Sequence, residues 1–150
     1  MKYVFCLLTV LFLGCAPETN CCTNLDVGMQ FAVLDANGND VLNPSNPNAF
    51  KAQNIKIYYV IDGVSEYQNS GNGGLLEISK YQNHENYIIS IGPYVGDHLS
   101  TTLIKWNEID IDTIKCEVER ISSNTRISKV WFNDVLKWDG VNERYFEVVK

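Results

Sequence analysis

The chain has 150 residues, which is enough for one domain but short for two. Hydrophobic residues make up 45% of it and charged residues 20%, the balance of an ordinary globular domain. With 18 acidic against 12 basic residues, the formal net charge is −6, and the basic residues form no cluster. The composition therefore argues against a nucleic-acid partner, which needs a concentrated positive surface.

The first 14 residues have the pattern of a secretory signal peptide. Lys2 supplies the positive charge, and the apolar run YVFCLLTVLFL (3–13) follows it. At about 1.5 Å per residue, this run is too short to cross a bilayer core of about 30 Å. We therefore expect export and removal of residues 1–14.

The end of this segment, LFLGC, resembles the lipobox of bacterial lipoproteins, with small Gly14 directly before Cys15. Phe12 stands where a smaller aliphatic residue is commoner, and such looser lipoboxes are typical of the Bacteroidetes. The resemblance implies cleavage before Cys15 and lipidation of its sulfur. The alternative is a plain secreted protein. A lipid would anchor the chain through buried acyl groups, each CH₂ contributing about 0.8 kcal/mol.

Residues 15–27 follow as a polar stretch without periodicity, and we expect them to tether a domain formed by residues 28–150. Cys21 and Cys22 lie in this tether, and Cys116 lies in the domain. In an oxidising compartment, Cys116 and one of the vicinal pair are able to form a disulfide. The alternative is that all three remain thiols. Paired zinc-ligand spacing is lacking.

From there on, short runs rich in Val, Ile, Tyr, Phe and Thr alternate with Gly, Asn, Asp and Pro, which is typical of an all-β domain. The strands predicted from these runs are 29–35, 54–61, 74–80, 86–92, 99–106, 112–121, 125–132, 135–138 and 144–149. No segment shows a helical stripe. So many short strands predict a two-layer antiparallel β-sandwich, with closure into a barrel as the alternative.

The run 112–121 shows the period of two most clearly. Ile114, Cys116 and Val118 fall on one side of the strand, and Lys115 and Glu117 fall on the other. One dry and one wet face indicate a strand that covers a core. We therefore expect the Cys116 thiol to be buried, which favours a thiol over a disulfide.

The segment DANGND (35–40) offers oxygen ligands at near-alternate positions: Asp35, Asn37, Asn39 and Asp40. Calcium binds six to eight hard oxygens, so a loose calcium loop is one interpretation, although the spacing excludes an EF-hand. The other is a plain turn, because Asn37-Gly38 tolerates positive φ and Asp and Asn side chains cap nearby amides. We favour the turn and expect no metal or other cofactor.

Together, FAVLDANGNDVLNP (31–44) and IKIYYVIDG (55–63) resemble a set of small lipoproteins of gut Bacteroidetes. Those proteins share a lipobox, an early F-x-V-x-D-x-x-G-x-D-L-L-x-P stretch and a later strand pair like TTLIKWNEIDIDTIKCEVE (101–119) and KVWFNDVLKW (129–138). Val41 replaces the usual leucine, and Asp134 stands where glycine is commoner. The resemblance implies an immunoglobulin-like or transthyretin-like sandwich on the cell envelope, and it carries no activity.

Residues for catalysis are scarce. His84 and His98 are the two histidines, and Asp97 and Ser100 beside His98 do not form a ready triad on a strand. The nearest carboxylate pair, Asp110 and Asp112, reads as a solvated rim rather than a glycosidase site. No phosphate loop or nucleophile elbow is present. We therefore expect the protein not to be an enzyme, with a hydrolase as the least supported alternative.

Aromatic residues are plentiful, and flat rings on an exposed face stack on sugar rings. The candidate binding residues are Tyr67, Tyr81 and Tyr94, in or beside loops, and Trp106, at a strand end. The competing interpretation is that these rings pack in the core. The expected function is a non-catalytic binding or accessory module for a glycan or a partner protein. It would be held by lipid to a membrane of the cell envelope, the outer membrane being favoured. The alternative is a structural or adhesion subunit.

Overall fold

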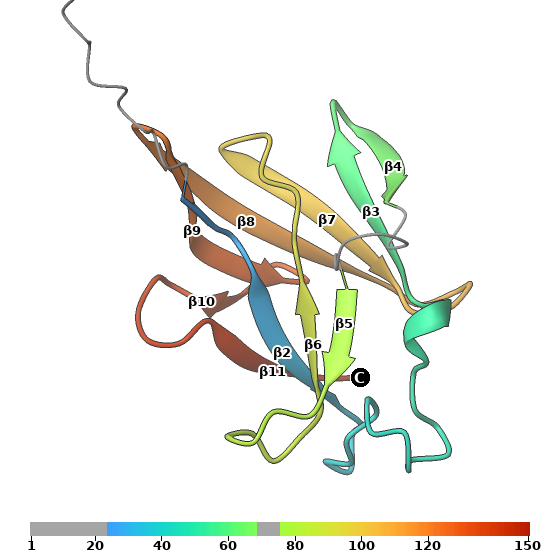
Figure 1. Cartoon of the computed structure of the whole chain (residues 1–150). Helices are drawn as coiled ribbons and strands as arrows, with labels where there is room; N and C mark the ends of the chain where they lie inside the picture. The colour runs from blue at the N-terminus through green and yellow to red at the C-terminus, as the bar shows by residue number, and fades with distance from the viewer. Residues whose placement is uncertain (1–23, 69–75) are drawn as a thin grey trace, which may run out of the picture.

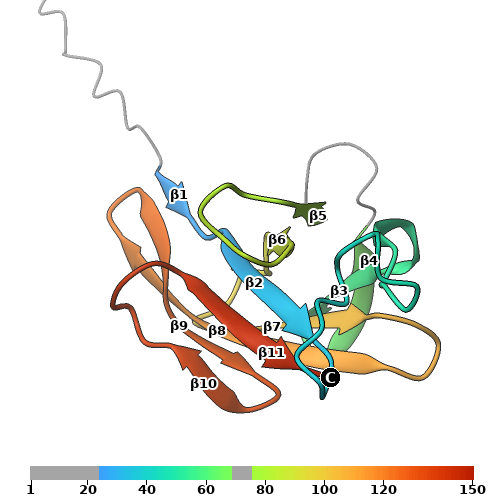
Figure 2. The same cartoon turned by 90° about the horizontal axis from the view of Figure 1, so that it is seen from below.

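A computed structural model describes residues 24–68 and 76–150, and two β-sheets packed face to face account for most of them (Figures 1 and 2). The strands are β1 (Leu25–Asp26), β2 (Met29–Leu34), β3 (Lys56–Ile61), β4 (Val64–Gln68), β5 (Leu76–Ser79), β6 (Ile88–Ile91), β7 (Leu99–Lys105), β8 (Ile111–Ile121), β9 (Asn124–Phe132), β10 (Val135–Trp138) and β11 (Tyr145–Val149). One 3₁₀ turn, Ala52–Asn54, precedes β3, and the described residues contain no α-helix.

Every predicted strand is present, and the predicted two-layer sandwich is confirmed. Prediction missed β1 and β4. The two-residue β1 lies inside the predicted tether, so the sandwich begins at Leu25 rather than residue 28. Strand β4 carries no buried residue, because it projects at the edge of its sheet with both faces exposed. A strand without a dry face has no alternation to detect.

The larger sheet has the strand order β1-β9-β8-β7-β3-β4, with β10 also paired to β9, and the smaller sheet has the order β11-β2-β6-β5. The expectation of purely antiparallel sheets was wrong at two places. Strand β1 runs parallel to β9, and β11 runs parallel to β2. Both parallel pairs join the ends of the described chain to strands distant in sequence, which a pattern of short hairpins does not predict.

Alternate side chains of both sheets fill the space between them. On β8, Ile114, Cys116 and Val118 all point inward and are buried, as the period of two predicts. Phe31 of the smaller sheet stacks on Phe146 of the same sheet, with ring centroids 5.1 Å apart, and meets Phe132 of the larger sheet edge-on at 5.7 Å. These rings tie the two layers together through one continuous apolar core.

Tight turns carry the positive φ angles that short polar residues tolerate. Asp62 and Gly63, between β3 and β4, have φ of 51° and 80°, and Asn133 and Asp134, between β9 and β10, have 48° and 65°. Two consecutive positive φ angles define the turn type that matches the twist of a hairpin. Both two-residue hairpins therefore have the backbone conformation that their turn residues favour, although the sequence predicted only the second pair of strands.

The two ends of the sandwich differ in what they carry. The long loop after β2 and the loop between β5 and β6 meet at the lower end in Figure 1. There the Asp40 carboxylate accepts hydrogen bonds from the backbone amides of Leu42 and Asn43 and, at 2.7 Å, from that of Tyr87. The opposite end contains β1, where the described chain begins.

Candidate functional site

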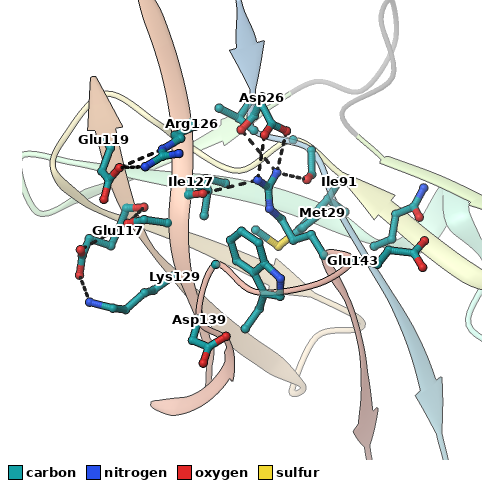
Figure 3. Close-up of a pocket in the computed structure, with 18 of the residues that line it drawn as sticks. Asp26, Met29, Ile91, Glu117, Glu119, Arg126, Ile127, Lys129, Asp139 and Glu143 are labelled. Carbon is teal, nitrogen blue, oxygen red and sulfur yellow. Dashed lines mark hydrogen bonds and ion pairs between the residues drawn. The ribbon is translucent and has the colours of Figure 1, made fainter. Parts of the chain in front are cut away.

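A hollow lined by about twenty of the described residues lies along the outer edge of β9 (Figure 3). Strand β1 pairs with β9 at Thr125 and Arg126, and β10 pairs with it from Val130 to Phe132. Between them, residues 127–129 pair at this edge with no strand among the described residues. The result is a groove of about 1030 Å³ between the edge of β9 and the ends of β2 and β6 in the smaller sheet, which we call the β9 groove.

The Arg144 side chain donates a hydrogen bond to β9 at this unpaired stretch. Its guanidinium lies 3.1 and 3.2 Å from the two carboxylate oxygens of Asp26, and it donates to the carbonyl oxygens of Gly28 at 2.7 Å and Ile127 at 3.4 Å. Its side chain is 12% exposed and lies over the Trp138 ring, 4.5 Å from the centroid. Arg144, in the segment before β11, thereby contacts both the chain entering β2 and the edge of β9. Its partners Asp26 and Ile127 are labelled in Figure 3.

Two further ion pairs line the groove on β8 and β9. Lys129 lies 3.1 Å from Glu117, and Arg126 donates to one Glu119 oxygen at 2.6 and 2.9 Å. The hydrogen bond from Lys129 is the main reason that the pKa of Glu117 is lowered. A glycosidase acid needs the opposite shift. This carboxylate is therefore held ionised, a state suited to accepting hydrogen bonds from a polar ligand.

The predicted aromatic residues do not share one surface. Tyr67 is 54% exposed on β4 and packs against Tyr58 on the outer face of the larger sheet, with centroids 5.5 Å apart. Tyr94 packs against Tyr59, whose hydroxyl donates to the carbonyl of Gly92 in the connection leaving the smaller sheet. Tyr81 lies beyond β5, in the loop before β6. The four candidates therefore do not form a single binding platform.

The prediction that Trp106 binds a ligand is wrong. It is 1% exposed, it contacts Phe50 with ring centroids 4.8 Å apart, and its indole nitrogen donates to Asp112 at 2.7 Å. A ring enclosed in this way has no face left for a ligand. Its position at a strand end misled the prediction, because the loop carrying Phe50 folds over that end.

The prediction that Asp110 and Asp112 are both exposed to solvent is also wrong for Asp112. This carboxylate is 6% exposed and points into the end of the sandwich, where it accepts hydrogen bonds from Trp106, Asn133 and Lys150. Asp110 is partly exposed and contacts Lys150 at 2.7 Å. The two residues differ because Asp110 precedes β8, whereas Asp112 lies in β8 on the same inward face as Ile114 and Cys116.

The DANGND segment has the geometry of a turn. The carboxylate of Asp35 accepts hydrogen bonds from the amides of Asn37 and Asn39 and from the Asn39 side chain, each at 2.8 Å. These bonds, the Asn39 side chain first, lower the pKa of Asp35. Asp40 is occupied by the backbone amides described above. This geometry favours the turn interpretation, and no group of three potential His, Cys, Asp or Glu ligands lies together within 24–68 or 76–150.

Both histidines have structural neighbours. The His84 ring stacks on Tyr145 with centroids 4.3 Å apart and lies 3.7 Å from Glu143. The Nδ1 atom of His98 lies 3.0 Å from the Val118 carbonyl oxygen. Ser100 donates to the Tyr94 carbonyl at 2.5 Å, so its hydroxyl is engaged with the backbone. The histidines are therefore not paired with a nucleophile.

Sequence reasoning missed Arg144 and Trp138. The contact between Arg144 and Asp26 spans 118 positions, and no periodicity marks it. The local signal in the sequence is the Asp139-Gly140 pair directly after Trp138, which suits a tight turn. Gly140 has a φ of 90°, and a Cβ there would lie 3.1 Å from the Ser128 carbonyl oxygen. The glycine thus allows the groove wall to approach β9.

No protein-family model, curated protein or solved structure matches the chain. Of the two described stretches, neither contains a helix with the length and apolar character needed to cross a membrane. Cys15, Cys21 and Cys22 lie outside the described residues, whereas Cys116 is a buried free thiol.

Proposed function

We propose that the chain is a cell-envelope lipoprotein whose sandwich, immunoglobulin-like or transthyretin-like, is a non-catalytic binding or accessory module for a glycan or a partner protein. The β9 groove is its binding site. The observation that carries this proposal is the groove's lining. The ion pairs Arg126–Glu119 and Lys129–Glu117 line this open groove together with Trp138. Charged groups beside an aromatic ring suit the binding of a polar ligand.

The position of the groove supports an anchored module. Nine steps along the chain lead from Cys15 to Asn24, where the described chain begins. A fully extended stretch of that length spans at most about 30 Å. A lipid on Cys15 would therefore hold the β1 end, and the groove beside it, close to a membrane. Any ligand would be captured near that surface.

Lipidation has a direct test in the host cell. Changing Cys15 to Ala removes the sulfur that would carry the lipid, so the protein should move from membrane fractions to the soluble fraction. Immunoblots of separated fractions measure this change. Retention of the variant in membranes would point to another anchor and contradict the lipid proposal.

Ligand binding is tested on a glycan array with the mature chain. The variant Arg126→Ala opens the Glu119 pair without disturbing buried groups, since the Arg126 side chain is 57% exposed. We expect glycan binding that weakens at least tenfold in this variant. Lys115→Ala is the matched control, because Lys115 pairs with Asp134 and does not line the groove. Equal loss in both variants, or none, would contradict the groove as the site.

A structural or adhesion subunit is the second candidate, and β4 favours it. This strand forms the end of the larger sheet, is exposed along most of its length and contains neither Pro nor Lys to discourage pairing. An exposed edge is able to add a strand from another molecule. Concentration-dependent oligomers that disappear in Ser65→Pro would favour this candidate, and a strict monomer would eliminate it.

A further inference from the structure

Five hydrogen-bonding side chains converge where β11 ends, at the opposite end of β2 from the β9 groove. The Lys150 Nζ lies 2.5 Å from Asp112 Oδ2 and 2.7 Å from Asp110 Oδ1. Asn133 Nδ2 donates to Asp112 Oδ1 at 2.7 Å, and Trp106 Nε1 donates to Asp112 Oδ2 at 2.7 Å. The amine, the carboxyl and a second carboxylate are thus in direct contact in a largely buried site.

We propose that Lys150 and Asp112 react with each other to form an intramolecular amide bond. The reaction needs an amine held against a carboxyl group and a neighbouring group that moves protons. Such fixed geometry replaces a bimolecular encounter, and well-oriented groups in one molecule reach effective concentrations of about 10⁵–10⁸ M. The main chain holds the lysine in place, because the Lys150 amide donates to the Leu34 carbonyl at 2.8 Å.

Asp110 is the proton carrier of this step. It accepts one proton from the Lys150 ammonium and passes it to Asp112 Oδ2, which leaves a neutral amine against a protonated carboxyl group. The Nζ lone pair then forms a bond to the Asp112 Cγ. Nζ now gives up a second proton, which Asp110 carries to Oδ2. The bond from Cγ to Oδ2 breaks, Oδ2 leaves as water, and Asp110 returns to its starting state. One ammonium and one carboxylate become one amide and one water, with no oxidation or reduction.

The hydrogen-bond donors around Asp112 fit each stage. As the amine attacks, negative charge develops on Oδ1, where the Asn133 side chain already donates. Trp106 donates to Oδ2, the oxygen that leaves. In the product, the amide oxygen keeps the hydrogen bond from Asn133, and the new N–H faces Asp110. The amide also replaces a buried ion pair, whose desolvation opposes folding.

The bond would join the two layers covalently. Asp112 belongs to β8 of the larger sheet, and Lys150 follows β11 of the smaller sheet. The link therefore fastens the last strand, which is held otherwise by its parallel pairing with β2 and by core packing. This inference is independent of any ligand in the groove.

Mass spectrometry of the mature chain, produced with no residues added after Lys150, tests the proposal. We expect the intact mass to be lower than the calculated mass by one water. Trypsin should yield residues 106–115 joined to residues 145–150, and fragmentation should place the link at Asp112. After denaturation, a carboxypeptidase that removes terminal lysine should fail to release Lys150.

Lys150→Arg is the matched control, because arginine keeps the positive charge beside both carboxylates but does not form this bond. That variant should show its full calculated mass and separate tryptic peptides, with an unchanged circular dichroism spectrum. Asp110→Asn should slow the appearance of the linked peptide at least tenfold. A wild-type chain with separate peptides and removable Lys150, or a link to Asp110 instead, would overturn the proposal.

Discussion

The two ends of the sandwich place charged groups in opposite ways. At the β9 groove, Glu117, Glu119, Arg126 and Lys129 lie in open pairs on the surface. At the other end, Asp112 is buried beneath Trp106 and held by three donors. Strand β2 connects the two, beginning with Met29 at the groove and ending with Leu34 beside Lys150.

This difference separates binding from stability. Solvent screens an exposed ion pair, which contributes about 0–1 kcal/mol, so its charges stay available to a ligand. A buried charge is not solvated by water, so its stability depends on hydrogen bonds and ion pairs with protein groups. Arg144 lies between these cases, because it sits beside the groove but is mostly buried. Mutations at the three places should therefore differ in size.

The largest effect is expected at the buried end. Asp112→Ala leaves the Trp106 indole N–H and the Lys150 amine without their shared acceptor. Removing one partner of a buried charged pair costs about 3–5 kcal/mol. Urea unfolding followed by circular dichroism measures this change. Glu108→Ala, which removes the exposed partner of Lys105, is the control and should change stability by less than about 1 kcal/mol.

Arg144→Ala should have the next largest effect. It removes the hydrogen bonds to Asp26, Gly28 and Ile127 and the contact with the Trp138 ring. Hydrogen bonds to charged groups contribute about 1.5–3 kcal/mol, and we expect a loss of this order in urea unfolding. Arg144→Lys should recover only part of it, because an ammonium lacks the planar fork. Full recovery by lysine would contradict the geometric role.

Cys116 reports on the core between the two ends. Burial raises the pKa of its thiol to about 12 from an ordinary value of 9.0. The neutral thiol is thus favoured in the folded state. Its contribution to stability is complete below about pH 9 and is lost as the pH rises towards about 12. Tyr145, whose pKa burial also raises to about 12, adds to the loss over the same range.

Alkylation of the tryptic peptide 116–120 measures this protection. At pH 8 the thiol should react only after denaturation, and the native protein should become reactive as the pH passes about 10. Rapid labelling of the native protein at pH 8 would show that the core opens readily, and the inward position of Cys116 would then not protect it.

The smallest effect is expected in the groove. Arg126→Ala breaks the pair with Glu119, and the free energy of unfolding should change by no more than about 1 kcal/mol. The same urea experiment serves as the measurement. A loss as large as that of Arg144→Ala would mean that the groove charges are structural, and the contrast between the two ends would fail.

Alternation of apolar and polar residues was enough to predict each strand with a dry face. On β8 it also placed Cys116 inside, because successive side chains of a strand point to opposite faces. The Asn133-Asp134 pair joins two predicted strands by the shortest hairpin, and both residues have the positive φ angles that such a turn needs. Local chemistry thus determined the elements and the class of the fold.

Tertiary structure alone decided which side chains meet. The parallel pairing of β11 with β2 places Lys150 beside Asp112. Arg144 lies between β1 and β10, where it contacts Asp26. These partners are distant along the chain, and closing such long loops leaves no periodic trace in the residues themselves. Trp106 is another example. Its position at a strand end predicts exposure, but the loop that carries Phe50, distant in sequence, covers it.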